Sequence, residues 1–385
     1  MSTKKNNYEF LLLQTVGIIL VVLGHKGGIS LFSEWFPAYS FHMPLFIFIS
    51  GYFYKSNSES NLKYCIMKKI KNLIIPYFIW NIVYGIIINI LIRYQVVEFG
   101  ERISFRTLFI DPWIHGHQFG LNVATWFVPA LFLIQVAYLL SRRVLNHIKI
   151  NNEYVIMGIF MVIGCVGVIL ANKGYTTHKY LTVIRTMFLI PFYHMGYLYR
   201  NKLENKYKFN SILYFIALFT IQFILLKKYV NISFSAVFCN DFNRENILLP
   251  YITSITGIMF WLKISKILAP LIGKNKVIKY IGSNTWDIMT HHQFVFFGIN
   301  LFFAITSNKL NLEGFNFEQF KHNCWYGYDA GDSRFLIFYT IAGVAVPLII
   351  KFYVENIMKS EKGLIFKQAL ISKFTSRSFT QYDPD

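Results

Sequence analysis

Ten apolar blocks, each close to the length of a membrane-spanning helix, constrain the fold of this chain more than any other feature of its sequence. A helix that crosses a bilayer core of about 30 Å needs roughly 20 mainly apolar residues. Over the 385 residues, 55% are hydrophobic and only 15% are charged, which is not the balance of a soluble protein. The pattern predicts an all-α integral membrane protein with about ten transmembrane helices, at residues 8–27, 38–54, 73–92, 124–140, 154–171, 180–199, 211–226, 246–262, 281–303 and 335–354.

Lysine and arginine are distributed unequally between the two sets of loops that these helices define. With the N-terminus inside, 25 of the 38 lysines and arginines fall on the inner side and 12 on the outer side, while Arg185 lies within a span. Cytoplasmic loops carry the excess of Lys and Arg in membrane proteins, so we expect both termini in the cytoplasm. The net charge of +19 would suggest nucleic acid in a soluble protein. Here it indicates membrane lipids with anionic headgroups, or an anionic cytoplasmic substrate, and no nucleic acid.

We expect a single membrane domain over residues 1–355, followed by a basic cytoplasmic tail over residues 356–385, because no repeat or Pro-rich linker divides the chain. Two predicted external loops, 93–123 and 304–334, are long and rich in aromatic and polar residues. Loops of this length are often functional, and their aromatic faces beside carboxylates suit sugar binding. The same aromatic residues are equally compatible with a belt at the membrane interface.

Polar side chains inside the apolar blocks are the main candidates for function, because in hydrocarbon they cost several kcal/mol unless they face a cavity or a partner. Gln14 and His25 are eleven residues apart. On a helix that spacing is three turns plus roughly 20°, so both lie on one face, about 16 Å apart along the axis. His42 in the second block and Arg185 in the sixth fall in the same outer half of the membrane.

The ninth block adds Asp287, His291 and His292. Asp287 and His291 are four residues apart and can meet on one helix face, whereas His292 points elsewhere. Helix packing explains a lone membrane histidine as well as function does, but four histidines and an arginine in one bundle favour a site for reaction or transport. No metal site is expected, since no HxxxH or HExxH spacing occurs, and Walker, GxGxxG and GxSxG motifs do not occur either. Cys239 and Cys324 both fall in predicted external loops, and the sequence leaves their pairing open.

Five segments, in order along the chain, resemble the membrane acyltransferase 3 family, whose members O-acylate cell-surface and exported glycans. The segments are residues 16–25 and 41–52, which are the strongest, then 126–131, 191–196 with Arg185, and 281–285 leading to His292. The resemblance implies an acyltransferase of the plasma membrane without a tightly bound cofactor. Its donor is expected to be cytoplasmic acyl-CoA, most simply acetyl-CoA, and its acceptor a hydroxyl of an extracytoplasmic polysaccharide or other glycan.

The resemblance and the polar residues of the spans together assign roles to individual side chains. His25 is the predicted base or transient acyl carrier, because an imidazole titrates near neutrality and is nucleophilic, and His42 is its catalytic partner. The remaining predicted site residues are Gln14, Arg185 and His292 for the donor or the oxyanion, and Trp126, Asp111 and Trp113 for the acceptor side. Inner lysines, notably Lys63, Lys68, Lys69 and Lys71, either attract the phosphates of CoA or simply belong to a positive inner loop.

One position of the first helix departs from the family pattern, which is Arg, ten residues, then His. His25 matches the histidine, but Gln14 stands where the arginine is expected. Glutamine donates hydrogen bonds but cannot neutralise a phosphate or carboxylate, so the departure is compatible with an altered donor, weak activity or an inactive chain. The alternative function is a carrier or flippase for a lipid-linked sugar or organic anion, since intramembrane His and Arg also serve transport. The sequence shows no internal duplication that would support this alternative.

The charge bias predicts the sidedness of every loop. Reporter fusions after residues 60, 145, 205 and 270 should be cytoplasmic, and fusions near residues 110 and 320 should be external, because Lys and Arg are retained on the cytoplasmic side. A paired reporter that is active on only one side of the membrane measures each position. Cytoplasmic activity at both 110 and 320 would contradict the predicted orientation.

Overall fold

A computed structural model describes residues 7–26, 32–204, 211–310, 314–332 and 335–359, and over these residues the chain is helical, without a β-strand. The α-helices are α1 (Tyr8–Gly24), α2 (His42–Tyr52), α3 (Leu62–Lys69), α4 (Ile75–Arg93), α5 (Asp111–Ile114), α6 (Phe127–His147), α7 (Glu153–Asn172), α8 (His178–Leu198), α9 (Ser211–Lys228), α10 (Leu249–Ile272), α11 (Lys276–Ser283), α12 (Thr285–Leu310), α13 (Phe317–His322) and α14 (Leu336–Lys359). Each of the ten predicted blocks overlaps one of these helices. The predicted tail lies outside the described residues from residue 360 onward.

Seven helical segments of the described chain are long and apolar enough to cross a membrane. They contain α4, α6, α7, α9, α10, α12 and α14. The other three blocks correspond to α1, which has 17 residues, to α2, which has 11, and to α8, which has 21 but is less apolar. The chain is therefore an all-helical membrane protein, while the count of ten spans and the orientation of the termini stay predictions.

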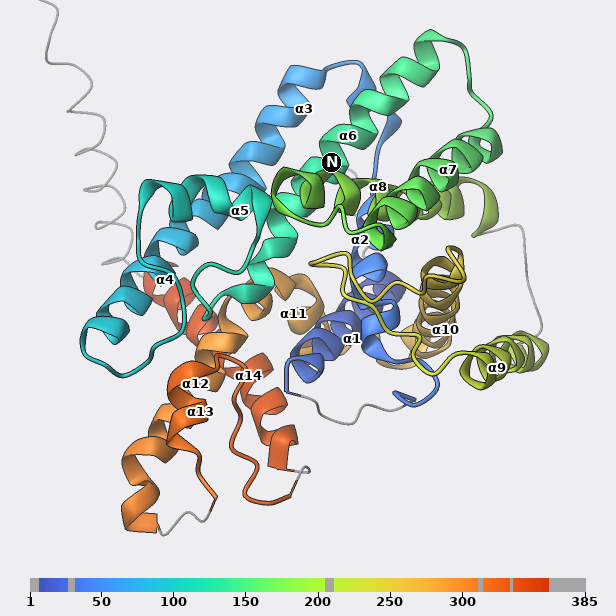
Figure 1. Ribbon diagram of the computed structural model, residues 1–385. Coiled ribbons are helices and arrows are strands. Elements are labelled where there is room, and N and C mark those ends of the chain that lie inside the picture. Colours follow the sequence, from blue (N-terminus) through green and yellow to red (C-terminus); the bar gives the residue numbers. More distant parts are fainter. Residues whose placement is uncertain (1–6, 27–31, 205–210, 311–313, 333–334, 360–385) are drawn as a thin grey trace, which may run out of the picture.

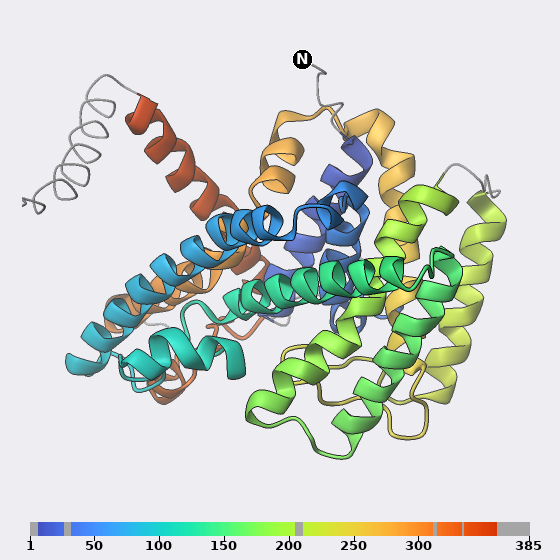
Figure 2. The same ribbon diagram turned by 90° about the horizontal axis from the view of Figure 1, so that it is seen from above.

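Helices α1 and α2 lie in the middle of the bundle, with α12 and α14 on one side and α9 and α10 on the other (Figures 1 and 2). The two central helices run in opposite directions. Asn7, before α1, donates a hydrogen bond to the hydroxyl of Tyr52 at the end of α2, at 2.9 Å. At the other end, the hydroxyl of Tyr39 donates to the carbonyl of Gly24 at 3.4 Å, and its ring packs edge-on against His42. One end of the pair thus carries the start of α1, and the other end carries His25.

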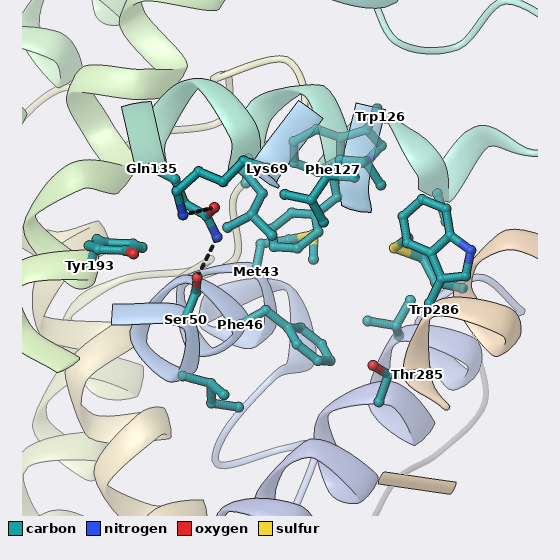
Figure 3. A pocket seen from close by; sticks show the side chains of 18 of the residues that line it. Met43, Phe46, Ser50, Lys69, Trp126, Phe127, Gln135, Tyr193, Thr285 and Trp286 are labelled. Carbon is teal, nitrogen blue, oxygen red and sulfur yellow. Dashed lines mark hydrogen bonds between the residues drawn. The ribbon is translucent and has the colours of Figure 1, made fainter. Parts of the chain in front are cut away.

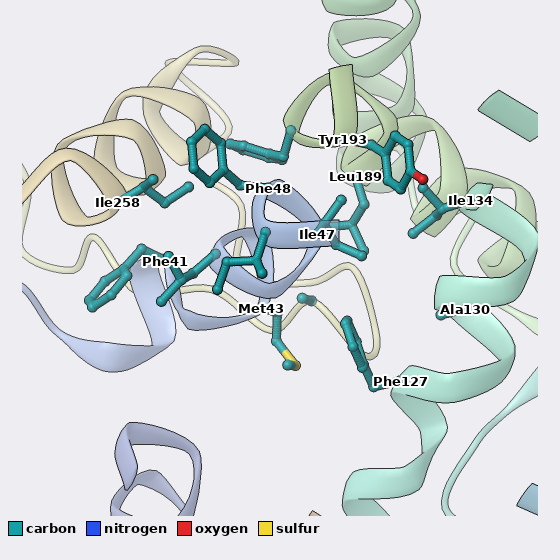
Figure 4. Packing of buried hydrophobic residues seen from close by; sticks show 14 of the residues in the cluster. Phe41, Met43, Ile47, Phe48, Phe127, Ala130, Ile134, Leu189, Tyr193 and Ile258 are labelled. Atoms are coloured by element: carbon teal, nitrogen blue, oxygen red, sulfur yellow. The ribbon is translucent and has the colours of Figure 1, made fainter. Parts of the chain in front are cut away.

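Close packing of α2 against α8 fixes the centre of the bundle. Gly51 of α2 faces the backbone of Tyr193, and Gly196 of α8 faces the backbone of Phe48, so closely that a Cβ atom at either glycine would overlap a carbonyl oxygen. Around this contact the apolar side chains of α2 insert between α6, α8 and α10 (Figure 4). Pro44 is accommodated in the first turn of α2, where an N–H has no intrahelical partner.

A buried ion-pair network fixes the turn that follows α2. Arg142 of α6 donates two hydrogen bonds to Glu153, at 2.6 and 3.0 Å, and one to Glu59, at 3.3 Å. The hydroxyl of Tyr54 also donates to Glu59, at 3.0 Å. A guanidinium that is 4% exposed is tolerated because charged hydrogen bonds surround it. Residues 56–59 are thereby held against α6.

The polar residues of α12 bind to different neighbours. Asp287 accepts a hydrogen bond from Lys351 of α14 at 2.6 Å, and Nδ1 of His291 lies 2.8 Å from the hydroxyl of Tyr84 on α4. Asp287 and His291, which can meet on one face of α12, thus each also make a hydrogen bond to a side chain of another helix. His292 points away from both, as predicted.

The glycine contact between α2 and α8 predicts a large effect of a single methyl group. Gly196→Ala should lower the free energy of unfolding by about 1 to 3 kcal/mol, because the backbones must separate to admit the Cβ atom. Thermal unfolding of the detergent-solubilised protein measures the change. Gly158→Ala on α7 is the matched control, since no atom lies within 4 Å of its Cβ position. Equal unfolding temperatures in the two variants would contradict the packing described here.

Candidate functional site

A cavity of about 940 Å³ runs alongside α1 and α2, from one end of the pair to the other. Its wall includes Lys55 and Asn57, which follow α2 at the end where α1 begins. It also includes His25 and Trp325, which lie at the opposite end. By the predicted orientation, the first end faces the cytoplasm and the second faces outside. We therefore call them the inner end and the outer end of the cavity.

The inner end of the cavity is basic and polar. Lys55, Lys68 and Lys69 line it, whereas Lys63 and Lys71 do not. Lys69 donates to Oε1 of Gln135 at 2.6 Å, and Nε2 of Gln135 donates to the hydroxyl of Ser50 at 2.9 Å (Figure 3). A mouth with ammonium groups and amide hydrogen-bonding groups is suited to an anionic ligand with a polar body.

The middle of the cavity is mainly apolar. Figure 3 shows Met43 and Phe46 from α2 and Phe127 from α6 on one side, with Thr285 and Trp286 of α12 across from them. We call this part the waist; its lining residues are Ile18, Met43, Phe46, Phe127, Leu131, Trp286 and Met289. Gln14 also lines the cavity and, within the described residues, has no hydrogen-bond partner. Its amide therefore faces the space that a ligand would occupy.

Imidazole and aromatic rings surround the outer end. His25, His42 and His117 line it together with Trp126, Phe238 and Trp325. The ring centroids of His25 and Trp325 lie 5.2 Å apart, and those of His117 and Trp325 lie 6.0 Å apart. Burial, and next the charge of Arg185, lower the pKa of His117 to about 4. This loop histidine is therefore neutral at neutral pH and can accept a hydrogen bond.

A chain of hydrogen bonds determines which nitrogen of His25 faces the cavity as a base. Nδ1 of His292 lies 2.8 Å from the carbonyl of Ile288, which can only accept, so this nitrogen carries a proton. In a neutral imidazole Nε2 of His292 must then accept, and its partner at 2.7 Å is Nδ1 of His25. Nδ1 of His25 is therefore protonated, and its Nε2 keeps the lone pair. The parallel rings, 2° apart in plane, are consistent with this bond.

His42 is fixed in the same tautomer by its own turn. Its Nδ1 lies 2.5 Å from the carbonyl of Ala38, so Nε2 is the acceptor. His25 and His42 thus both line the cavity with one unprotonated nitrogen each. His292, by contrast, is 0% exposed and lies behind His25, so it acts on the cavity through His25.

The other predicted site residues differ in their relation to the cavity. Trp126 lines it. Arg185 lies behind Trp126, with its guanidinium 4.9 Å from the indole ring and a hydrogen bond to the carbonyl of Val237. Asp111 pairs with Arg106 at 3.2 Å, and Trp113 packs between Phe78 and Phe132, so neither lines the cavity.

No role was predicted from the sequence for Gln135 and Ser50, which line the cavity, or for Lys26, which is outside its lining. Gln135 and Ser50 are polar residues inside apolar blocks, and this property marks them in the sequence as candidates for the site. Lys26 is 7% exposed although a lysine at the end of a span looks like an ordinary interfacial cation. Its ammonium lies 3.1 Å from the carbonyl of Trp325 and 2.5 Å from that of Tyr326.

Cysteines and metal-binding groups add no further site. Cys239 and Cys324 are both free thiols, so the disulfide left open by the sequence is not formed in this structure. Burial raises the pKa of the Cys324 thiol to about 11. Among the described residues, no group of three or more His, Cys, Asp or Glu side chains is arranged to hold a metal ion.

The comparison with protein families agrees with this geometry. A family model described as an acyltransferase domain matches residues 7–352, which is most of the chain. The protein is therefore a membrane acyltransferase, and it belongs to the acyltransferase 3 family. Searches of the curated proteins and of the solved structures found no match.

The hydrogen bond between His25 and His292 predicts different effects for two adjacent histidines. His292→Ala should lower the rate of acyl transfer by about tenfold or more, because an orienting partner of a reactive imidazole is removed. His291→Ala is the matched control and should stay near the wild-type rate, since His291 contacts Tyr84 outside the cavity. The rates are compared at equal amounts of folded protein. Equal rates in the two variants would show that His25 needs no orienting partner.

Proposed function

We propose that this acyltransferase moves an acetyl or similar short acyl group from cytoplasmic acyl-CoA to a hydroxyl of an extracytoplasmic glycan. The observation that carries the proposal is the single cavity with lysines at one end and the unprotonated Nε2 of His25 at the other. A membrane acyltransferase with its donor and acceptor on opposite sides needs such a passage. The plasma membrane is its expected location.

The inner end of the cavity fits the nucleotide part of the donor. Lys55 and Lys68 are exposed at the mouth and supply positive charge for phosphates. Lys69 lies deeper, where its hydrogen bond to Gln135 orders the amide. The pantetheine arm of CoA contains two amide groups, and the side chains of Gln135 and Ser50 offer hydrogen bonds to such groups beside the apolar waist.

This arrangement also gives Gln14 a role without a positive charge. Gln14 lines the cavity on α1, whereas the lysines of the mouth come from the segment after α2 and from α3. The phosphates therefore have cations without an arginine at residue 14. The free amide of Gln14 can instead hydrogen-bond the arm of the donor, which supports an active enzyme with an altered donor contact.

The chemistry follows from the tautomers of the outer histidines. The acceptor hydroxyl attacks the thioester carbonyl, and its proton passes to Nε2 of His25 as general base. The new C–O bond forms, the C–S bond breaks, and the imidazolium returns the proton to the departing thiolate. His42 offers a second unprotonated nitrogen to orient the hydroxyl, because its Nδ1 is already bonded to Ala38. His292 stabilises the imidazolium of His25 through their shared hydrogen bond.

Release of CoA tests the proposed function. Membranes that contain the protein should release free CoA from acetyl-CoA when the glycan fraction of the source cells is added, and should label that glycan with the acetyl group. His25→Ala should lower the rate by about 10² to 10⁴-fold, the usual contribution of a general base. A carrier or flippase would bind or move its ligand without releasing CoA. Release that is absent, or unchanged in the His25→Ala variant, would contradict the proposal.

A further inference from the structure

Trp325 combines two properties at the outer end of the cavity. Its indole ring lies 5.2 Å from the ring of His25. The same residue is 39% exposed, although it is a large aromatic residue. Trp325 is partly exposed and adjacent to His25, so part of its ring surface is available to a ligand. The ring of a fully packed residue would offer no such surface.

The main chain around Trp325 is held by side chains of α12 and by Lys26, which follows the end of α1. Lys26 donates to the carbonyls of residues 325 and 326, Gln293 of α12 donates to the carbonyl of Cys324, and Asn300 of α12 donates to the carbonyl of Tyr326 at 2.7 Å. Tyr339 of α14 holds Asn300 in turn, at 2.6 Å. Three consecutive carbonyls therefore point inward onto fixed donors, and the loop cannot shift without leaving buried polar groups unpaired.

Lys26 is the donor of this set that is linked directly to the reactive residue. It follows His25 in the chain, so one peptide unit connects the base to the anchor. Lys26 is 7% exposed, and its ammonium lies over the rings of Phe296 and Tyr339, 4.9 and 5.4 Å from their centroids. Among the described residues no carboxylate pairs with it. The loop carbonyls and the ring faces are thus the groups that compensate its burial.

We propose that Trp325 is a stacking platform for a pyranose ring of the acceptor, and that Lys26 is the positioning residue that fixes this platform beside His25. The C–H groups on one face of a pyranose carry partial positive charge and pack on the negative face of an indole ring. A sugar stacked on Trp325 brings its hydroxyls toward Nε2 of His25. The acceptor role rests on the function proposed above, whereas the role of Lys26 in placing Trp325 does not.

Chemical modification of His25 tests the placement without any acceptor. The probe is diethyl pyrocarbonate, which carbethoxylates unprotonated imidazole nitrogens, and mass spectrometry measures the adduct at each histidine. Trp325→Ala and Lys26→Met should each increase the modification rate of His25 by about tenfold, whereas Trp325→Phe should keep the wild-type rate. The magnitude for Lys26→Met follows from the loss of charged hydrogen bonds to two carbonyls.

Two controls make the result specific. His322, whose side chain is 51% exposed, reports the reagent dose and should react equally in all variants. Lys179→Met removes an exposed lysine of α8 and should leave His25 protected. An unchanged rate at His25 in Trp325→Ala would overturn the platform. A raised rate in Trp325→Ala with an unchanged rate in Lys26→Met would overturn the role of Lys26.

Partition of the acetyl group tests the acceptor role. Membranes with their own glycan receive [14C]acetyl-CoA, and the label in glycan is compared with the label released as free acetate. Trp325→Ala and Lys26→Met should lower this ratio about tenfold while the KM for acetyl-CoA stays within about twofold of wild type, and Trp325→Phe should restore the ratio. A raised KM for acetyl-CoA with an unchanged ratio would overturn the acceptor role. If the wild-type protein labels no glycan, the acceptor role fails together with the proposed function, and the histidine modification still decides whether Lys26 positions Trp325.

Discussion

Inside a membrane, each polar side chain needs a partner or a cavity, and this constraint organises the described part of the protein. Arg142 is surrounded by carboxylates, Lys26 by carbonyls and aromatic rings, and Lys351 pairs with Asp287. What is left facing the cavity is the set with spare hydrogen-bonding capacity, above all Nε2 of His25 and the amide of Gln14. The buried cations with partners belong to the scaffold, whereas these two groups are available to a ligand.

The same constraint explains why several residues predicted from the sequence line the cavity. The eleven-residue spacing of Gln14 and His25 is a property of one helix, so helix geometry alone put both on one face, and both line the cavity. The family segments identified His25, His42 and His292. The first two line the outer end of the cavity, and His292 lies directly behind His25. The fold class followed from the apolar blocks, since each of them overlaps a helix.

What the sequence could not provide is the set of contacts between distant segments. Asp287 and His291 can meet on one face of their own helix, but their hydrogen bonds to Lys351 and Tyr84 on other helices could not be predicted. Asp111 and Trp113 looked like acceptor-side residues because of their composition, yet the fold directs them into local contacts outside the cavity. No role could be predicted for Lys26, because only the position of residues 325 and 326 shows the contacts of its ammonium.

A passage between two compartments can also let ions leak across the membrane and so dissipate its electrochemical gradient. Water and protons enter polar cavities more readily than apolar ones, so the polar ends of this cavity favour both. The waist lies between these ends and is lined by methionine, aromatic and aliphatic side chains, and apolar walls of this kind disfavour water and ions. Under the proposed function, the arm of a thioester donor would occupy the waist and displace water from it. Bound substrate would then also limit the leakage of ions, and a polar substitution in the waist would increase that leakage.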